Sequence, residues 1–208
     1  MSQEDKPVEK LNKNGDPDAP MPFFSSVRER RLWAWTVAVV VAIYSTLGLA
    51  ATLAGELRVR GLIDAFFLLG FLLVLATILT QGLKTRPSGA EIGVALGVVA
   101  AYLMVFVRMA IPVEERTHLI EYGVLALFIY EALTERASQG RRVPVPALLA
   151  VVAAVVIGVL DECIQEFLPN RVFDPRDILF NVLAAVMAVA ASVALGWARR
   201  WVSLAARQ

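Results

Sequence analysis

The chain has 208 residues, of which 58% are hydrophobic and 19% are charged, and its mean hydropathy is +0.64. This apolar share exceeds that of an ordinary globular domain, so we expect much of the protein surface to face lipid. The formal net charge is only +1, which excludes the strong overall field that recruits nucleic acid. These properties predict an integral membrane protein without a nucleic-acid partner.

The N-terminal segment and the cysteine content narrow the class of protein further. Residues 1–26 are polar and lack the short apolar core of a signal peptide, so we expect no signal peptide here. We assign residues 1–31 to a disordered cytoplasmic tail. Cys163 is the single cysteine, which excludes an internal disulfide and a metal site built from cysteines.

Six stretches are long and apolar enough to span a membrane, because a bilayer core of about 30 Å takes about 20 helical residues. The fifth carries Pro144 and Pro146 in its first turn, where a missing backbone donor costs little. The predicted fold class is all-α, a polytopic membrane bundle of six transmembrane helices within residues 32–202. In chain order the predicted spans are Leu32–Ala54, Leu62–Gly82, Ala90–Ile111, His118–Leu133, Val143–Leu160 and Ile178–Trp197.

The distribution of arginine predicts the orientation, because short cytoplasmic loops keep an excess of Lys and Arg. With the N-terminus inside, the pairs Arg141–Arg142 and Arg199–Arg200 lie on the cytoplasmic side with no acid beside them. The arginines on the opposite side are interleaved with acids. We therefore predict that both termini are cytoplasmic. The inner ends of the first and sixth helices also carry the tryptophans of an interfacial aromatic belt, namely Trp33, Trp35, Trp197 and Trp201.

A G-x-x-x-G pattern occurs in the third predicted span, formed by Gly93 and Gly97. Such a pattern allows two helices to approach closely. We expect this helix to pack tightly within the bundle, while the oligomeric state stays open.

The first concentration of polar residues begins the fourth predicted helix, where residues 114–122 read EERTHLIEY. In a helix, His118, Glu121 and Tyr122 stand at positions i, i+3 and i+4 and share one face. That face would present an imidazole, a carboxylate and a phenol together. Because ionisable side chains at membrane depth cost roughly 2.5–3.5 kcal/mol each, the pattern favours a functional site.

The second concentration lies between the fifth and sixth predicted helices, where residues 161–181 read DECIQEFLPNRVFDPRDILFN. Asp161 and Gln165 share a helical face, and Glu162 lies about 100° round the helix. Asp177 and Asn181 repeat the i, i+4 spacing at the entry to the sixth helix. The predicted orientation brings both segments to the outer face of the membrane.

The two segments resemble the VanZ-like family, through E-R-x-H-x-x-E-Y in the first and D-E-x-x-Q-x-x-x-P-x-R-x-x-D-x-x-D-x-x-x-N in the second. The resemblance implies a bacterial multi-pass protein of the cytoplasmic (inner) membrane, and the founding member is associated with low-level teicoplanin resistance. Many relatives carry Lys and Asp ahead of the histidine, where this chain carries Glu and Arg. The matching motif positions are Arg116, His118, Glu121, Tyr122, Asp161, Glu162, Gln165, Arg171, Asp174, Asp177 and Asn181.

Two candidates for acid–base chemistry come from the first segment, His118 and Glu121. An unperturbed histidine pKa of about 6.5 suits His118 to proton transfer near neutral pH. The structural alternative is that His118 pairs with Glu121 or Glu115 and only orients a loop.

Two further candidates come from the second segment, Asp161 and Glu162. They could act as an acid and a base, because neighbouring carboxylates push one pKa upward. The structural alternative is that they bridge to Arg171 and Arg176 and hold the helical hairpin closed.

A metal ion such as Mg²⁺ or Zn²⁺ would need these four catalytic candidates, His118, Glu121, Asp161 and Glu162, to converge. No spacing among them demands a metal, so we predict no metal site and no cofactor.

The remaining polar residues are candidates for ligand binding. Mixed acids and arginines suit an amphiphile with phosphates or amines, such as a lipid-linked cell-wall precursor or a lipoglycopeptide, held beside the lipid bilayer. The predicted ligand-binding residues are Arg116, Tyr122, Gln165, Arg171, Asp174, Arg176, Asp177 and Asn181.

Three functions are consistent with this pattern. The first is a cell-envelope protein that binds such an amphiphile, with a link to teicoplanin resistance; a purely surface-based binding role would tolerate neutralisation of Asp161 or Glu162. The second is a membrane-embedded hydrolase or transferase acting on a lipid headgroup, which would not tolerate it and needs a lateral opening between helices. The third is a small transporter, against which the mainly Ala, Val and Leu composition deeper in the helices argues.

Overall fold

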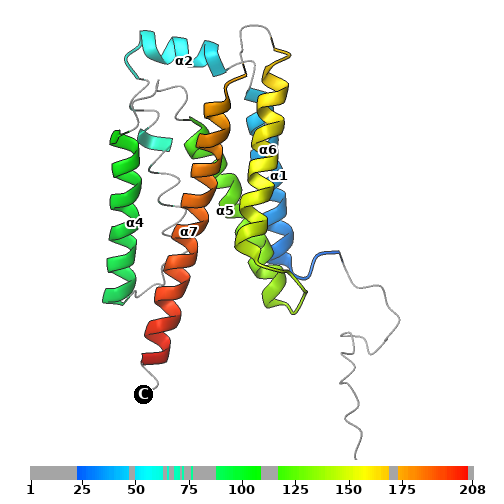
Figure 1. The fold of residues 1–208 in the computed structure, drawn as a ribbon, viewed down its shortest axis with the longest axis vertical. Coiled ribbons are helices and arrows are strands. Elements are labelled where there is room, and N and C mark those ends of the chain that lie inside the picture. The colour runs from blue at the N-terminus through cyan, green and yellow to red at the C-terminus, as the bar shows by residue number, and fades with distance from the viewer. Residues whose placement is uncertain are drawn as a thin grey trace, which may run out of the picture.

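The computed structural model describes residues 23–46, 50–62, 65, 68–70, 72, 76, 88–108, 117–168 and 173–205. Within these ranges the regular elements are all helices, which confirms the all-α prediction for this part of the chain (Figure 1). They are α1 (Val27–Thr46), α2 (Ala50–Val59), α4 (Gly89–Arg108), α5 (Thr117–Ser138), α6 (Pro146–Gln165) and α7 (Pro175–Ala205).

The first predicted span, Leu32–Ala54, is divided between two helices. α1 begins at Val27, inside the segment assigned to the disordered tail, and ends at Thr46. α2 then begins at Ala50 and lies across one end of the bundle (Figure 1). A continuous run of apolar residues therefore does not become a single straight helix here. Residues 1–22 of the predicted tail and most of the second predicted span, Leu62–Gly82, lie outside the described residues.

The later helices agree better with the predicted spans. α4 begins at Gly89 behind a capping box, in which the Ser88 hydroxyl accepts from the Glu91 backbone N–H at 3.3 Å and the Glu91 carboxylate accepts from the Ser88 N–H at 2.8 Å. α6 starts at Pro146, so Pro144 lies before the helix. Pro175 likewise stands at the first position of α7.

Two helices in the described ranges are long and apolar enough to cross a membrane. These are α6 and residues Pro175–Leu204 of α7, each with a mean hydropathy of 2.4 in its most apolar stretch. Gly89–Met104 is a shorter apolar helix. The six-span topology and the orientation of the termini stay predictions.

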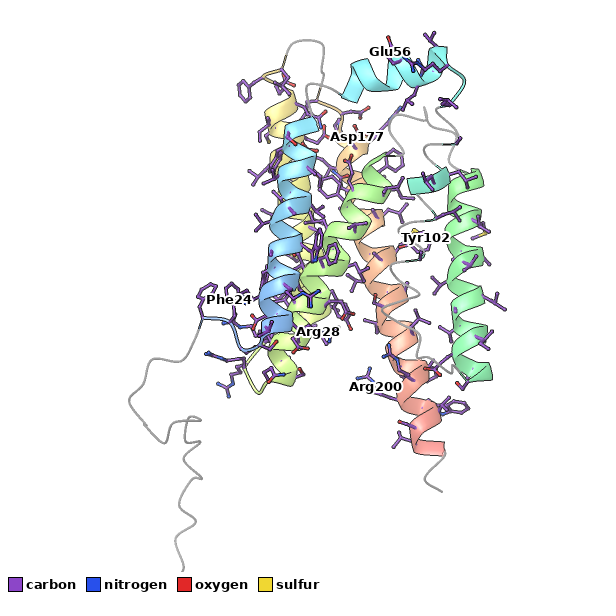
Figure 2. All side chains as sticks on the ribbon, turned by 180° about the vertical axis from the view of Figure 1, so that it is seen from behind. Phe24, Arg28, Glu56, Tyr102, Asp177 and Arg200 are labelled. Atoms are coloured by element: carbon purple, nitrogen blue, oxygen red, sulfur yellow. The ribbon has the colours of Figure 1, made fainter. Side chains whose placement is uncertain are left out.

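The two ends of the bundle differ in chemistry. Figure 2 labels Asp177 near one end, which we name the Asp177 end, and Arg28 and Arg200 near the other, which we name the Arg200 end. α5 and α7 begin at the Asp177 end and run toward the Arg200 end, while α1 and α6 run the opposite way (Figure 1).

α5 is the central helix of the bundle. It packs against α1, α6 and α7, whereas α4 packs against α7 (Figure 1). Tyr122, Leu125, Ala126 and Ala132 of α5 are completely buried. In a membrane bundle, a helix with polar residues is expected to lie inside, because its polar groups then avoid lipid.

Small residues face the interior of the bundle, and larger apolar residues face outward. On α6, Ala150 and Ala154 are fully buried, while Val152, Val156 and Leu160 are exposed. Such an apolar exterior would promote aggregation in water, but lipid tails solvate it well. The small inward residues also allow the helix axes to approach closely.

Helix α5 ends in a Schellman motif at the Arg200 end. Gly140 takes a φ of 80°, a conformation that glycine adopts without steric cost. The Gly140 N–H then donates to the Ala137 carbonyl at 3.0 Å, and the Arg141 N–H donates to the Arg136 carbonyl at 3.3 Å. This turn connects α5 to α6 as two antiparallel neighbours.

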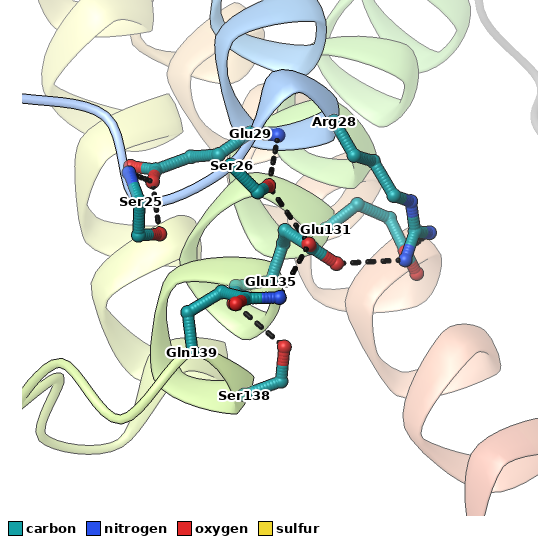
Figure 3. Close-up of polar contacts among 8 residues, drawn as sticks. All are labelled: Ser25, Ser26, Arg28, Glu29, Glu131, Glu135, Ser138 and Gln139. Carbon is teal, nitrogen blue, oxygen red and sulfur yellow. Dashed lines mark hydrogen bonds and ion pairs between the residues drawn. The ribbon is translucent and has the colours of Figure 1, made fainter. Parts of the chain in front are cut away.

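Glu29 is the centre of a polar network that joins the start of α1 to the end of α5, and Figure 3 shows its carboxylate beside Ser25. Its carboxylate is fully buried and accepts from the Ser25 N–H at 2.6 Å, from Arg136 Nη1 at 3.0 Å and from Trp33 Nε1 at 3.4 Å. Burial raises the pKa of Glu29, but the hydrogen bonds from Ser25 and Arg136 outweigh it and hold this pKa below its ordinary value of 4.5.

A second set of contacts at this end involves Arg28. Arg28 binds Glu131 at 2.9 Å and Glu135 at 3.0 Å, and the Ser26 hydroxyl donates to Glu135 at 2.8 Å (Figure 3). Residues at the start of α1 thus pair with Glu131, Glu135 and Arg136 of α5, because α1 packs directly against this helix.

We expect Glu29→Ala to lower the free energy of unfolding at pH 7 by about 2–3 kcal/mol, because it leaves the Arg136 and Ser25 donors without their acceptor. Thermal and denaturant unfolding of the detergent-solubilised protein measures this loss. Since the native pKa of Glu29 is depressed, its contribution is complete above pH 4.5 and disappears as the pH falls through that lower value.

The matched control is Arg28→Ala, whose ion pairs are at the exposed surface and should contribute less than about 1 kcal/mol. Equal losses in the two variants, or a Glu29→Ala loss that persists in acid, would contradict the central role of Glu29.

Candidate functional site

Six polar side chains from three helices are buried inside the bundle at the Asp177 end. α5 contributes one of them, the last two turns of α6 contribute three, and the first two turns of α7 contribute two. Each is at most 7% exposed. We name this set the buried polar cluster; its members are Tyr122, Asp161, Glu162, Gln165, Asp177 and Asn181.

Hydrogen bonds connect α5 to α6 within the buried polar cluster. The Tyr122 hydroxyl donates to Asp161 Oδ2 at 2.9 Å. Gln165 Nε2 lies 3.3 Å from both Asp161 Oδ2 and Glu162 Oε1. The shared face predicted for Asp161 and Gln165 is therefore confirmed, and the amide of Gln165 extends it to Glu162.

The segment before α7 closes the cluster from one side. The Asp174 N–H donates to Glu162 Oε2 at 3.4 Å, and Asp174 Oδ1 accepts from the Arg176 N–H at 2.8 Å. Asp174 is thus the N-cap of α7, a role that explains it without a ligand. Asp177, in the first turn of α7, is favoured there by the positive end of the helix dipole.

α6 and α7 approach each other closely beside the cluster, at Gly158. A Cβ atom on Gly158 would lie 2.8 Å from Asn181 Nδ2 and 3.2 Å from Tyr122 Cε1. Only a glycine fits this position without displacing Asn181 and Tyr122. The absence of a side chain on α6 thereby lets residues of α5 and α7 meet.

Asn181 is 1% exposed, and neither its Nδ2 donor nor its Oδ1 acceptor has a hydrogen-bond partner among the described residues. A buried amide without partners costs roughly 1–3 kcal/mol, so native proteins usually satisfy it with a water, an ion or a ligand. The amide of Asn181 is therefore available to a bound group within the cluster.

The structure describes the other predicted site residues less completely. His118 is the second residue of α5, but its side chain lies outside the described residues, as do Arg116 and Arg171. Glu121 is half-buried on α5 beside Tyr122. The Arg176 side chain is exposed and forms no ion pair with a described residue, so the predicted bridge from Asp161 or Glu162 to Arg176 is wrong.

No group of three or more His, Cys, Asp or Glu side chains in the described part of the chain is arranged to hold a metal ion. The cluster offers buried hydrogen-bonding groups from neighbouring helices. Tyr122 and Gln165 fix the orientation of Asp161, and Gln165 also contacts Glu162.

A protein-family model described as VanZ/LLP1 matches residues 20–196. The chain belongs to the VanZ/LLP1 family. The matched range contains both motif segments, so the buried polar cluster lies within the VanZ/LLP1 region. Family membership and the two long apolar helices together indicate a membrane protein. No curated protein and no solved structure matches the chain.

Two residues that shape the cluster have little signal in the sequence. Gly158 appears only as one glycine in an apolar helix, and its role becomes visible when α7 packs on it. Tyr44 of α1 donates its hydroxyl to the Ile157 carbonyl at 3.2 Å, which ties α1 to α6 one helical turn from Asp161. Neither contact follows from the periodicity of a single helix.

We expect Gly158→Ala to lower the free energy of unfolding by about 1–3 kcal/mol, because the new methyl group must displace Asn181 or Tyr122. The control is Gly93→Ala on α4, where a Cβ meets nothing within 4 Å, so stability should stay equal or rise by up to about 1 kcal/mol. Thermal melting in detergent compares the two variants. If both melt like the unmodified protein, the close contact at Gly158 is wrong.

Proposed function

We propose that this chain is a bacterial cell-envelope membrane protein in which the buried polar cluster faces the outside and binds an amphiphilic envelope ligand through an amine or another cationic group. A lipid-linked cell-wall precursor or a lipoglycopeptide has this chemistry. The association of the founding family member with teicoplanin resistance is consistent with such a ligand.

The observation that carries the proposal is the unsatisfied amide of Asn181 inside a group of buried carboxylates. A buried amide without partners is costly, so a bound group that satisfies it is favoured. An amine that donates a hydrogen bond would satisfy Asn181 Oδ1, and the acids beside it would favour its positive charge. This combination favours an amine over a phosphate.

Apolar surface next to the cluster suits the lipid part of an amphiphile. Leu160, Ile164 and Phe167 are exposed on and just after the last turns of α6, beside Asp161 and Glu162. A headgroup in the cluster and an acyl chain along this side of α6 would use both surfaces at once.

The opposite chemistry of the two bundle ends supports an outward-facing cluster. The Arg200 end carries two arginine doublets that have no acid beside them in the sequence, Arg141–Arg142 and Arg199–Arg200, and these favour the cytoplasmic side. The cluster would then open to the outer side of the cytoplasmic membrane, in a multi-pass protein with both termini inside.

Substituted-cysteine labelling tests this orientation. In a Cys163→Ser background, which removes the exposed native thiol, a membrane-impermeant reagent should label Thr117→Cys and Asn170→Cys in intact cells. Gly140→Cys, in the turn at the Arg200 end, should react only after permeabilisation. Labelling of positions 117 and 170 from opposite sides would overturn the shared outer site.

Binding to the full chain in lipid nanodiscs tests the ligand class. We expect a lipid-linked cell-wall precursor with a free lysine amine to bind, and acetylation of that amine, Asp161→Asn or Asn181→Ala to weaken binding about tenfold, equivalent to about 1.4 kcal/mol. Glu56→Gln, an exposed carboxylate change on α2 at the same end, should leave binding unchanged.

Equal binding of the acetylated and free precursors, or unchanged binding by Asp161→Asn and Asn181→Ala, would contradict amine recognition. Teicoplanin susceptibility of a Gram-positive host that expresses the same variants adds a cellular measurement, and it should follow the order of the binding constants.

A further inference from the structure

An open groove separates α4 from α7 on a side of the bundle away from the buried polar cluster. Its volume is about 450 Å³, within the range of about 300–1,000 Å³ that is usual for ligand sites. Figure 2 labels Tyr102 between these two helices. Apart from the Tyr102 hydroxyl, the described lining is apolar.

The groove exists because both helices present small residues to it. Gly97 and Ala101 line it from α4, and Ala190, Ala191 and Ala194 line it from α7. Among the described residues a Cβ on Gly97 would meet nothing within 4 Å, so α4 packs against α7 through other residues than Gly93 and Gly97. Protein interiors rarely leave such a space empty, because the lining atoms lose their van der Waals contacts.

The surface around the groove is apolar and exposed. Ile92 and Leu96 on α4, and Val186 and Val193 on α7, all point away from the rest of the protein. In a membrane protein this surface contacts lipid tails, which are flexible enough to enter a narrow apolar groove. An acyl chain is therefore the occupant with the matching chemistry along its length.

Positive charge lies beyond one end of the groove. Along α7, Arg199 follows Ala194 by five residues, which corresponds to about 7–8 Å. Arg199 is partly exposed with Nε 3.9 Å from Glu91, and Arg200 is exposed (Figure 2). The side chain of the exposed Arg200 donates no hydrogen bond to a described residue, so its guanidinium group is available to an anion, and Arg199 adds positive charge beside Glu91.

Two tryptophans of α7 lie at the same height along the helix as Arg199 and Arg200. Trp197 and Trp201 are exposed and stack with their rings 6.4 Å apart. Tryptophan concentrates at the boundary between lipid tails and headgroups. A phosphate at Arg199 and Arg200 would thus lie at headgroup depth while its chain enters the groove.

From the groove, the arginines and the tryptophan pair, we propose that α4 and α7 form a binding site for an anionic phospholipid, with one acyl chain in the groove and the phosphate at Arg199 and Arg200. The site is separate from the buried polar cluster, so it does not depend on the function proposed above. The proposed ligand is a phospholipid of the surrounding bilayer.

Native mass spectrometry of the full chain, released from detergent micelles with added lipid, tests the site. We expect phosphatidylglycerol to bind about tenfold more tightly than phosphatidylcholine with the same chains. Arg199→Gln combined with Arg200→Gln should reduce the phosphatidylglycerol affinity to that of phosphatidylcholine. Arg30→Gln combined with Arg31→Gln removes the same charge from exposed positions on α1 and should keep the preference.

Filling the groove provides an independent test. Gly97→Leu on α4 and Ala194→Leu on α7 should each reduce binding of both lipids at least tenfold, whereas Gly93→Leu, outside the groove lining, should not. Circular dichroism melting checks that each variant is folded, and the two filling variants on different helices guard against a local folding defect.

Three results would overturn the proposal. The first is equal affinity for the two lipids, and the second is an equal loss of preference in the Arg30/Arg31 control, which would indicate a general surface charge effect. The third is unchanged lipid binding by both filling variants. If delipidated protein instead forms dimers that Gly97→Leu abolishes, the groove belongs to a contact between two copies of the chain.

Discussion

The burial of α5 between α1, α6 and α7 is the constraint on which the rest of the structure depends. A buried helix must find partners for every polar group that it carries, because neither lipid nor a packed apolar interior supplies them. Tyr122 near its start finds Asp161 of α6, and Arg136 near its end finds Glu29 of α1. Helix α5 thus contributes to one polar site at each end of the bundle, and the two sites differ in whether all their polar groups have partners.

The site at the Arg200 end is complete, whereas the buried polar cluster is not. Around Glu29, described donors from Ser25, Trp33 and Arg136 account for the carboxylate, as expected for a purely structural contact. In the cluster, Asn181 keeps an unused donor and an unused acceptor in a fully buried position. This difference is the physical basis for proposing an envelope ligand at the buried polar cluster and a structural role for the contacts of Glu29.

Small residues on α6 and α7 have two opposite effects. At Gly158 the helices approach so closely that a methyl group would not fit, and the polar residues of three helices meet as a result. Between α4 and α7 the small residues, such as Ala194, meet no partner of sufficient size and leave an open groove. The same residue type therefore produces tight contact or free volume, depending on the distance between the helix axes.

The sequence by itself determined the helical class, the membership of the VanZ/LLP1 family and the faces shared within one helix, such as Asp161 with Gln165. These features depend on residues a few positions apart, and the 3.6-residue period fixes their relative directions. Only the tertiary structure decided the different directions of α1 and α2, the pairing of Arg28 with Glu131 and the contact at Gly158. Each depends on the rotation and spacing of neighbouring helices, and these follow from packing the whole bundle.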